Sequence, residues 1–283
     1  MSSPKYSALV SADEMRGASG WKIFDCSHDV SDGTAGERQF LEEHIPGALH
    51  INLDEVLSGR KTGRNGRHPL PDPEDVAAVL SRFGVGQNDR VVAYDRSGGL
   101  FASRFWWTLR WLGHDSVSVL DGGFAEWKAR EGVGTVELHV PTPTLFTPRP
   151  DRQMTVDATF IEMSLRDPSL ILVDARSTSR FAGIGETLDS RGGHIPGAIN
   201  RPYTENLAAD GCFKIKEVLA IEWRALLGHR EVRNLISTCG SGVSACHNLL
   251  ALEIAGLADG ARLYPGSWSE WSSNPDLPIE TSV

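Results

Sequence analysis

The chain has 283 residues, of which 40% are hydrophobic and 23% are charged, and its net charge is −9. This length suggests about two domains. The negative charge argues against a nucleic-acid or anionic-membrane partner, and the absence of a run of about 18 apolar residues argues against a transmembrane helix. The opening segment MSSPKYSALVSADEM lacks the apolar core of a signal peptide, so we expect a cytoplasmic protein.

Three motifs occur twice, in the same order. HIPGALHINL at 44–53 returns as HIPGAINRPY at 194–203, IFDCS around Asp25 returns as LVDARS around Asp174, and DGGFAEW at 121–127 returns as YPGSWSEW at 264–271. This order predicts two copies of one domain. Four prolines within 141–150 favour an extended linker. We therefore expect domains at 1–140 and 153–283, joined by a linker at 141–152.

Short apolar runs alternate with helical segments in each half. In chain order, we expect a strand at 90–94, a helix at 101–112, a strand at 170–174, a helix at 215–227, a strand at 234–238 and a helix at 243–255. The aromatic residues of 101–112 are expected in a core and not on a base-stacking platform. The basic stretch 59–67 is expected to be a solvated loop. This alternation predicts an α/β fold with mostly parallel sheets flanked by helices, in which ligands gather at the carboxyl ends of strands.

Cys239 follows one of these strands and opens the loop CGSGVSA. The residues after it are mostly small: Gly240, Ser241, Gly242, Val243 and Ser244. Such a loop can turn its N–H groups inward at a helix N-terminus and form an anion-binding concavity. These groups and the helix dipole would stabilise a Cys239 thiolate, so the sequence predicts a nucleophile. A buried cysteine beside a tight turn is the alternative.

The other cysteines lack such surroundings. We expect Cys26 and Cys246 in cores and Cys212 in a loop. The four cysteines form no C-x-x-C pair, which excludes the usual zinc-finger and thioredoxin signatures. In a reducing compartment we expect them to be free thiols.

The loop CGSGVSA, the doubled HIPGA and the closing GSWSEW together resemble the two-domain rhodanese superfamily of sulfurtransferases, over essentially the whole chain. The resemblance implies two tandem rhodanese-like domains. The loop is similar to that of the 3-mercaptopyruvate sulfurtransferases, because thiosulfate-preferring members usually have Arg and Lys where this chain has Gly240 and Ser241. Charged donors suit the thiosulfate dianion, whereas mercaptopyruvate carries one carboxylate remote from its sulfur. Thiosulfate stays open as the alternative donor.

The resemblance also implies site residues. Arg180 matches the family's arginine in an Arg-Phe pair that binds the substrate carboxylate, and Arg191 is the candidate for a second arginine before the HIPGA motif. Asp54 and His68 match positions that face the active-site cleft and, with Ser241, assist proton transfer. The loop residues 240 and 242–244 would also contact the substrate.

The first half implies one nucleophile per chain, because Asp95 of YDRSGG stands at the position of the cysteine and cannot accept sulfur. The implied reaction forms a Cys239 persulfide, releases pyruvate and passes sulfur to a thiol such as reduced thioredoxin, or to cyanide. No metal or organic cofactor is expected. A cysteine phosphatase would need arginine at position 245, where the chain has alanine, and a non-catalytic sulfur-carrier or regulatory module would predict a damaged loop.

Overall fold

The computed structural model describes residues 7–130 and 132–282. The chain divides into two compact units that do not follow the two halves strictly. Unit 1 comprises the described part of Met1–Gly59 with Pro71–Asp151 and Ala209–Phe213, and unit 2 comprises Arg60–Leu70, Arg152–Ala208 and the chain from Lys214 onward. The loop Arg60–Leu70 therefore belongs to the unit that contains Cys239. Across 7–130 and 132–282, no helix is both long and apolar enough to cross a membrane.

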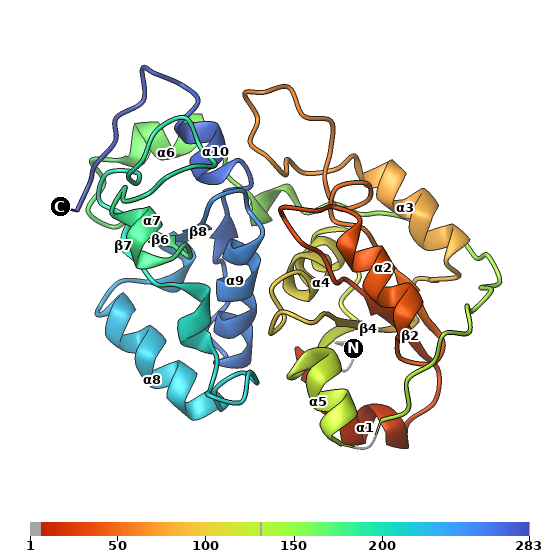
Figure 1. Cartoon of the computed structure of the whole chain (residues 1–283). Helices are drawn as coiled ribbons and strands as arrows, with labels where there is room; N and C mark the ends of the chain where they lie inside the picture. The colour runs from red at the N-terminus through yellow and green to blue at the C-terminus, as the bar shows by residue number, and fades with distance from the viewer. Residues whose placement is uncertain (1–6, 131, 283) are drawn as a thin grey trace. The chain divides into compact units, whose positions relative to one another are not determined.

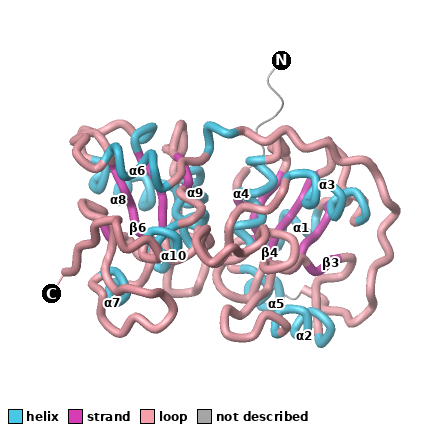
Figure 2. The backbone as a smooth tube through the Cα atoms, turned by 90° about the horizontal axis from the view of Figure 1, so that it is seen from above, coloured by secondary structure: helices cyan, strands magenta, loops and turns pink. Residues whose placement is uncertain are grey.

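Unit 1 is built on a parallel sheet with the strand order β1-β5-β4-β2-β3. The strands are β1 (Leu9–Val10), β2 (Trp21–Asp25), β3 (Ala48–His50), β4 (Arg90–Tyr94) and β5 (Val117–Leu120). The helices are α1 (Ala12–Gly17), α2 (Ala35–Glu42), α3 (Pro73–Arg82), α4 (Ala102–Trp111) and α5 (Gly123–Ala129). The strands lie inside the unit and the helices lie around them (Figure 2).

Unit 2 has a smaller parallel sheet with the order β7-β6-β8-β9. Its strands are β6 (Ile171–Asp174), β7 (Ile199–Asn200), β8 (Leu235–Thr238) and β9 (Arg262–Leu263). Its α-helices are α6 (Ala158–Ser164), α7 (Thr178–Phe181), α8 (Lys216–Leu227), α9 (Ser244–Ile254) and α10 (Ser267–Trp271), and 3₁₀ turns span Arg152–Met154, Tyr203–Asn206 and Val232–Asn234. The helix α9 runs beside β8 and α8 (Figure 1). The predicted α/β architecture is confirmed, and the six predicted elements are present within one residue of their expected bounds.

The two units repeat one backbone design. Asp25 pairs with Tyr94 across β2 and β4, and Asp174 pairs with Thr238 across β6 and β8. The next residue after each inner strand is Asp95 in unit 1 and Cys239 in unit 2. Their carbonyl groups accept hydrogen bonds from the first turns of α5 and α10, at 3.0 and 2.9 Å. The predicted repeat and the equivalence of these two positions are therefore confirmed.

The histidines of the repeated HIPGA motifs are structural in both units. The His44 ring stacks on Phe40 and its Nδ1 bonds that residue's carbonyl oxygen at 2.7 Å. The His194 ring stacks on Phe181 and its Nδ1 bonds that carbonyl oxygen at 2.8 Å. Because each histidine ties a helix end to the start of the next strand, the motif recurs for reasons of folding.

The inner strand β8 and most of the helix α4 are buried. All four residues of β8 are buried, as expected for a parallel strand covered on both faces. Phe105, Trp106 and Trp107 of α4 are 0–3% exposed. The aromatic residues of this helix therefore belong to the core of unit 1, as the sequence predicts.

Candidate active site

The strand β8 and the helix α9 hold Cys239 between them. Cys239 is the first residue after β8 and is 1% exposed, and α9 begins five residues later at Ser244. Gly242 lies between them with φ +78°, and a Cβ there would lie 2.5 Å from the carbonyl oxygen of Pro265. Both the backbone angle and the lack of space require glycine at this position. The small residues of the loop therefore allow it to turn tightly.

The sulfur of Cys239 faces the backbone of its own loop. The Gly242 N–H donates a hydrogen bond to Sγ at 3.1 Å, and the Ser241 nitrogen lies 3.5 Å from Sγ. N–H groups in these places stabilise negative charge on sulfur, in a thiolate and in a persulfide. Val243 precedes α9 and is buried, while Ser244 opens that helix and is half-buried. The nucleophilic role of Cys239 stays a prediction, which this geometry supports.

The start of α10 fixes the loop from the other side. The Cys239 N–H donates to Ser267 Oγ at 3.1 Å, and Ser267 Oγ donates to the Tyr264 carbonyl oxygen at 2.9 Å. The Trp268 N–H donates to the Cys239 carbonyl oxygen at 2.9 Å. Ser267 has φ 53°, a left-handed conformation that is strained for a serine. In this conformation its hydroxyl group holds the backbone N–H of Cys239.

Sequence reasoning missed Ser267, although the repeat contains the signal. In the motifs DGGFAEW and YPGSWSEW, Gly123 of unit 1 stands where unit 2 has Ser267, and Gly123 has φ 59°. A serine at a place where its repeat has a left-handed glycine indicates that the hydroxyl is needed. In unit 2 that hydroxyl binds the backbone of the predicted nucleophile.

The structure brings His68 and Ser241 together. Nδ1 of His68 lies 2.7 Å from Ser241 Oγ, and both residues are 7% exposed. His68 comes from the loop Arg60–Leu70 of unit 2, so this contact lies inside one unit. Since Ser241 is two residues after Cys239, the imidazole and hydroxyl can move a proton near the sulfur.

Arg180 lies in α7 and binds two buried carboxylates. Its Nη2 donates to Asp189 at 2.9 Å and to Glu186 at 3.1 Å. Burial raises the pKa of Asp189, against the opposing charges of Arg67 and Arg180. Burial also acts to raise the pKa of Glu186, but the N–H of Leu188 and the charge of Arg180 outweigh it and lower that pKa. These carboxylates orient the guanidinium.

Arg67 joins this cluster, and sequence reasoning missed it. Its Nη1 donates to Oδ1 of Asp189, and its side chain is 31% exposed. The prediction of a solvated loop at 59–67 is therefore wrong for Arg67, although Arg64 is exposed. The error arose because a run of scattered arginines has no feature that separates a paired guanidinium from a hydrated one.

Two further arginines have structural contacts. Arg176 binds Asp174 through Nη2 at 2.6 Å and lies over the Trp268 ring. Arg191 donates to four backbone carbonyl groups near the C-terminus: those of Trp271, Ser272, Asn274 and Leu277. These bonds hold the C-terminal segment on unit 2. The carboxylate-binding role predicted for Arg191 stays a prediction and competes with this one.

The equivalent loop of unit 1 shows what such a loop can bind. The Asp95 carboxylate accepts hydrogen bonds from four backbone N–H groups, those of Ser97, Gly99, Phe101 and Ala102, at 2.7–2.9 Å. Burial raises the pKa of Asp95, and the four N–H groups oppose that rise. The same backbone frame thus surrounds a carboxyl group in unit 1.

Asp54 lies in unit 1. Its Oδ2 lies 3.5 Å from Nε2 of His28, and its N–H donates to the side chain of Asn52 at 2.8 Å. The role in proton transfer that the resemblance implies for Asp54 stays a prediction.

The remaining cysteines differ from Cys239 in their surroundings. Cys26 is buried, and burial raises the pKa of its thiol. Cys246 lies inside α9, where its Sγ donates to the Gly242 carbonyl oxygen at 3.3 Å. Cys212 is half-buried, and burial together with Asp121 raises the pKa of its thiol to about 12. A raised pKa disfavours the reactive thiolate, so Cys26 and Cys212 are poor nucleophiles.

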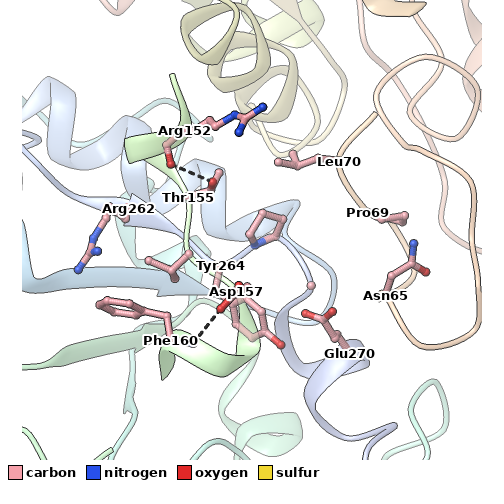
Figure 3. A pocket seen from close by; sticks show the side chains of 13 residues that line it. Asn65, Pro69, Leu70, Arg152, Thr155, Asp157, Phe160, Arg262, Tyr264 and Glu270 are labelled. Carbon is pink, nitrogen blue, oxygen red and sulfur yellow. Dashed lines mark hydrogen bonds between the residues drawn. The ribbon is translucent and has the colours of Figure 1, made fainter. Parts of the chain in front are cut away.

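Unit 2 also has a hollow of about 550 Å³, shown in Figure 3. It is lined by Asn65, Pro69, Leu70, Arg152, Thr155, Val156, Asp157, Phe160, Arg262, Tyr264, Pro265, Gly266 and Glu270. Burial raises the pKa of Glu270, and the Arg262 guanidinium lies over the Phe160 ring. None of the predicted site residues lines this hollow. In 7–130 and 132–282 there is also no group of three or more His, Cys, Asp or Glu side chains arranged to hold a metal ion.

The chain resembles known proteins in both of its units. The rhodanese-like domain family matches residues 9–130 and 158–274. The chain is 44% identical to a probable 3-mercaptopyruvate sulfurtransferase of Pseudomonas aeruginosa, over 92% of each protein. It is 34% identical to a thiosulfate sulfurtransferase of Cricetulus griseus, over 98% of this chain and 95% of that protein. The solved structure of SseA, a 3-mercaptopyruvate sulfotransferase of Escherichia coli, superposes with a TM-score of 0.78 and 31% identity, over 94% of this chain and 100% of that one.

Proposed function

Because this chain belongs to the rhodanese family and contains two copies of its domain, we propose that it is a sulfurtransferase that takes sulfur from 3-mercaptopyruvate through a persulfide on Cys239. One observation carries this proposal: the Cys239 sulfur is held against the N–H groups of its own loop, with Arg180 beside the next residue, Gly240. The sulfur acceptor is a thiol, such as that of reduced thioredoxin, or cyanide. The reaction releases pyruvate.

In the first step, the Cys239 thiolate attacks the sulfur atom of 3-mercaptopyruvate. A sulfur–sulfur bond forms while the carbon–sulfur bond breaks, and the electron pair of the broken bond leaves on the enolate of pyruvate. The enolate takes a proton and departs as pyruvate. The contact of 2.7 Å between His68 Nδ1 and Ser241 Oγ provides a path for this proton, and Arg180 binds the substrate carboxylate. The N–H groups of Ser241 and Gly242 stabilise the sulfur anion.

In the second step, an acceptor thiolate or cyanide attacks the outer sulfur of the persulfide. The sulfur–sulfur bond breaks and its electrons return to Cys239, which restores the thiolate. Because the donor product leaves before the acceptor reacts, ping-pong kinetics follow. The four cysteines of the chain are free thiols, the state that a reducing compartment maintains, and we propose that the reaction occurs in the cytoplasm.

We expect His68 and Ser241 to act as a unit. His68→Ala and Ser241→Ala should each lower kcat by about 100-fold, and the double variant should lose little more than the worse single variant, because each removes the same proton path. Steady-state kinetics with 3-mercaptopyruvate measures this. His229→Ala, at an exposed position of unit 2, is the control and should retain kcat. Losses that multiply in the double variant would show that the two side chains act separately.

The choice of donor tests the proposal directly. Arg67 and Arg180 lie beside Gly240, and Arg176 joins them through Glu186. These three arginines are paired with three carboxylates, those of Asp174, Glu186 and Asp189, so the cluster carries little net charge for a dianion. We therefore expect kcat/KM for 3-mercaptopyruvate to exceed that for thiosulfate by at least about 10-fold. Steady-state assays with each donor, with cyanide as the acceptor, measure the ratio. A higher kcat/KM for thiosulfate would favour the second candidate, which the likeness to thiosulfate sulfurtransferases supports.

A further inference from the structure

The hollow of unit 2 lies outside the residues that the proposed reaction uses. Its volume of about 550 Å³ falls within the range of about 300–1,000 Å³ that is typical of small-molecule sites. The loop Arg60–Leu70 lines one part of it, and the segment 264–266, which follows β9, lines another (Figure 3). Both belong to unit 2, so the hollow is a feature of one compact unit that has room for a small organic molecule.

Arg262 brings a positive charge without a counter-ion to one side of the hollow. Among the residues that the structure describes, no carboxylate pairs with its guanidinium, and its buried Nε donates no hydrogen bond. The guanidinium lies over the Phe160 ring, 4.6 Å from the ring centre, and burial lowers the pKa of Arg262. Arg152 is exposed and also lines the hollow. A partly buried guanidinium without a partner favours the binding of an anion.

Glu270 brings a carboxyl group to the other side, across the hollow from Arg262 (Figure 3). Burial raises the pKa of Glu270, and the charge of Asp157 adds to this rise. The fully buried hydroxyl of Tyr264 opposes the rise, but no hydrogen bond of good geometry joins it to a partner in the described residues. Two carboxyl groups and a hydroxyl oxygen without a cation favour the binding of an ammonium group.

The segment 264–266 also contacts the cysteine loop. The Tyr264 carbonyl oxygen accepts a hydrogen bond from Ser267 Oγ, which itself accepts the N–H of Cys239. The Pro265 carbonyl oxygen lies so close to Gly242 that a Cβ there would be 2.5 Å away. A molecule that packs on this segment would stabilise the conformation in which it holds the loop. The hollow is therefore linked to Cys239 by a short chain of direct contacts.

We propose that this hollow is an effector site for a short peptide in its zwitterionic form, with the carboxylate of the peptide on Arg262 and its ammonium group on Glu270. A free α-amino acid carries both charges on one carbon atom. A dipeptide separates them by a peptide unit and so suits two charged side chains on opposite sides of the hollow. Its apolar side chains would pack on Leu70, Val156 and Phe160, which also line the hollow. The site is separate from the proposed donor site and does not depend on the proposed function.

Calorimetric titration with the dipeptide Leu-Leu tests the binding. We expect a Kd of about 0.1–1 mM, in line with the size of the ligand. N-acetyl-Leu-Leu lacks the ammonium group and Leu-Leu-amide lacks the carboxylate, and each should bind at least about 10-fold more weakly. L-leucine should also bind at least about 10-fold more weakly. Equal affinity for all four molecules would overturn the assignment of a zwitterion with separated charges.

Variants of the two charged side chains test where the dipeptide binds. Arg262→Gln and Glu270→Gln should each weaken the binding of Leu-Leu by at least about 10-fold. Arg224→Gln and Glu217→Gln remove the same charges from exposed positions of α8, and these matched controls should leave the Kd unchanged. If Leu-Leu does not bind the wild-type protein, or if it binds both hollow variants as tightly as the controls, the proposed site is overturned.

Alkylation of Cys239 tests the link to the cysteine loop. Because Cys239 is 1% exposed, iodoacetamide reaches its sulfur when the loop opens, and a bound dipeptide should make this opening rarer. We expect saturating Leu-Leu to slow the alkylation of Cys239 at least about twofold, as measured by mass spectrometry of the peptides, and to have no such effect in Arg262→Gln. Binding that leaves this rate unchanged would overturn the role of the hollow as an effector site. Neither measurement requires sulfur transfer, so a failure of the proposed function would appear separately, in the donor assays.

Discussion

In the Cys239→Ser variant, we expect sulfur transfer to fall by at least about 1,000-fold with either donor, because a serine hydroxyl neither ionises at neutral pH nor accepts sulfur. The wild-type protein, incubated with 3-mercaptopyruvate and no acceptor, should gain about 32 Da, the mass of one sulfur atom. Mass spectrometry of the intact chain measures this gain. It should be absent from the variant.

The controls use the other thiols of the chain. Cys212→Ser removes a half-buried thiol and should leave both the mass gain and kcat unchanged. Cys246→Ser tests a buried thiol of α9 that is bonded to the Gly242 carbonyl group. A gain of sulfur that survives in Cys239→Ser would place the persulfide on another cysteine and would overturn the proposed nucleophile.

We expect a gain of one sulfur atom per chain, because the equivalent loop of unit 1 has no cysteine. Asp95 stands where unit 2 has Cys239. Its carboxyl group accepts hydrogen bonds from the backbone N–H groups that a sulfur anion would need. Both loops use one backbone frame to surround an acidic side chain. In unit 1 the side chain in this frame is the carboxyl group of Asp95, whereas in unit 2 it is the thiol of Cys239.

The fold could be predicted because its signals are local. The strands at 90–94 and 234–238 are short apolar runs, and a run of four or five buried residues between loop residues is typical of a parallel strand. The repeated motifs supplied the domain pattern without any knowledge of contacts. The loop after Cys239 could be predicted for the same reason, since its tight turn depends on small residues that follow one another in the chain.

The arginine cluster beside Gly240 could be predicted only in part, because its contacts join distant segments. Asp189 binds Arg67 across 122 positions and Arg180 across nine, and nothing in the basic stretch marks Arg67 as the arginine that would be paired. Ser267 shapes the backbone of Cys239 across 28 positions. Charge patterns along a chain predict exposure well, but they do not reveal which charges meet after folding.

Arg180 and Arg191 show this difference most clearly. We expect the alanine variant of one to change substrate binding and the alanine variant of the other to change stability. For Arg180→Ala, we expect KM for 3-mercaptopyruvate to rise by about 100-fold with a smaller change in kcat, because the guanidinium fork to the carboxylate is lost. For Arg191→Ala, we expect KM to stay constant and the free energy of unfolding to fall by about 2 kcal/mol, because four carbonyl groups of the C-terminal segment lose a charged donor.

Donor kinetics and urea unfolding of both variants, side by side, measure the two effects. Arg180→Lys is the control for a purely structural effect, because it keeps a cation near Glu186 and Asp189. This variant should fold normally while its KM stays raised. If Arg191→Ala instead raised KM as much as Arg180→Ala at unchanged stability, Arg191 would bind the donor as the resemblance implies. The two variants together decide whether Arg180 binds the donor carboxylate alone or with Arg191.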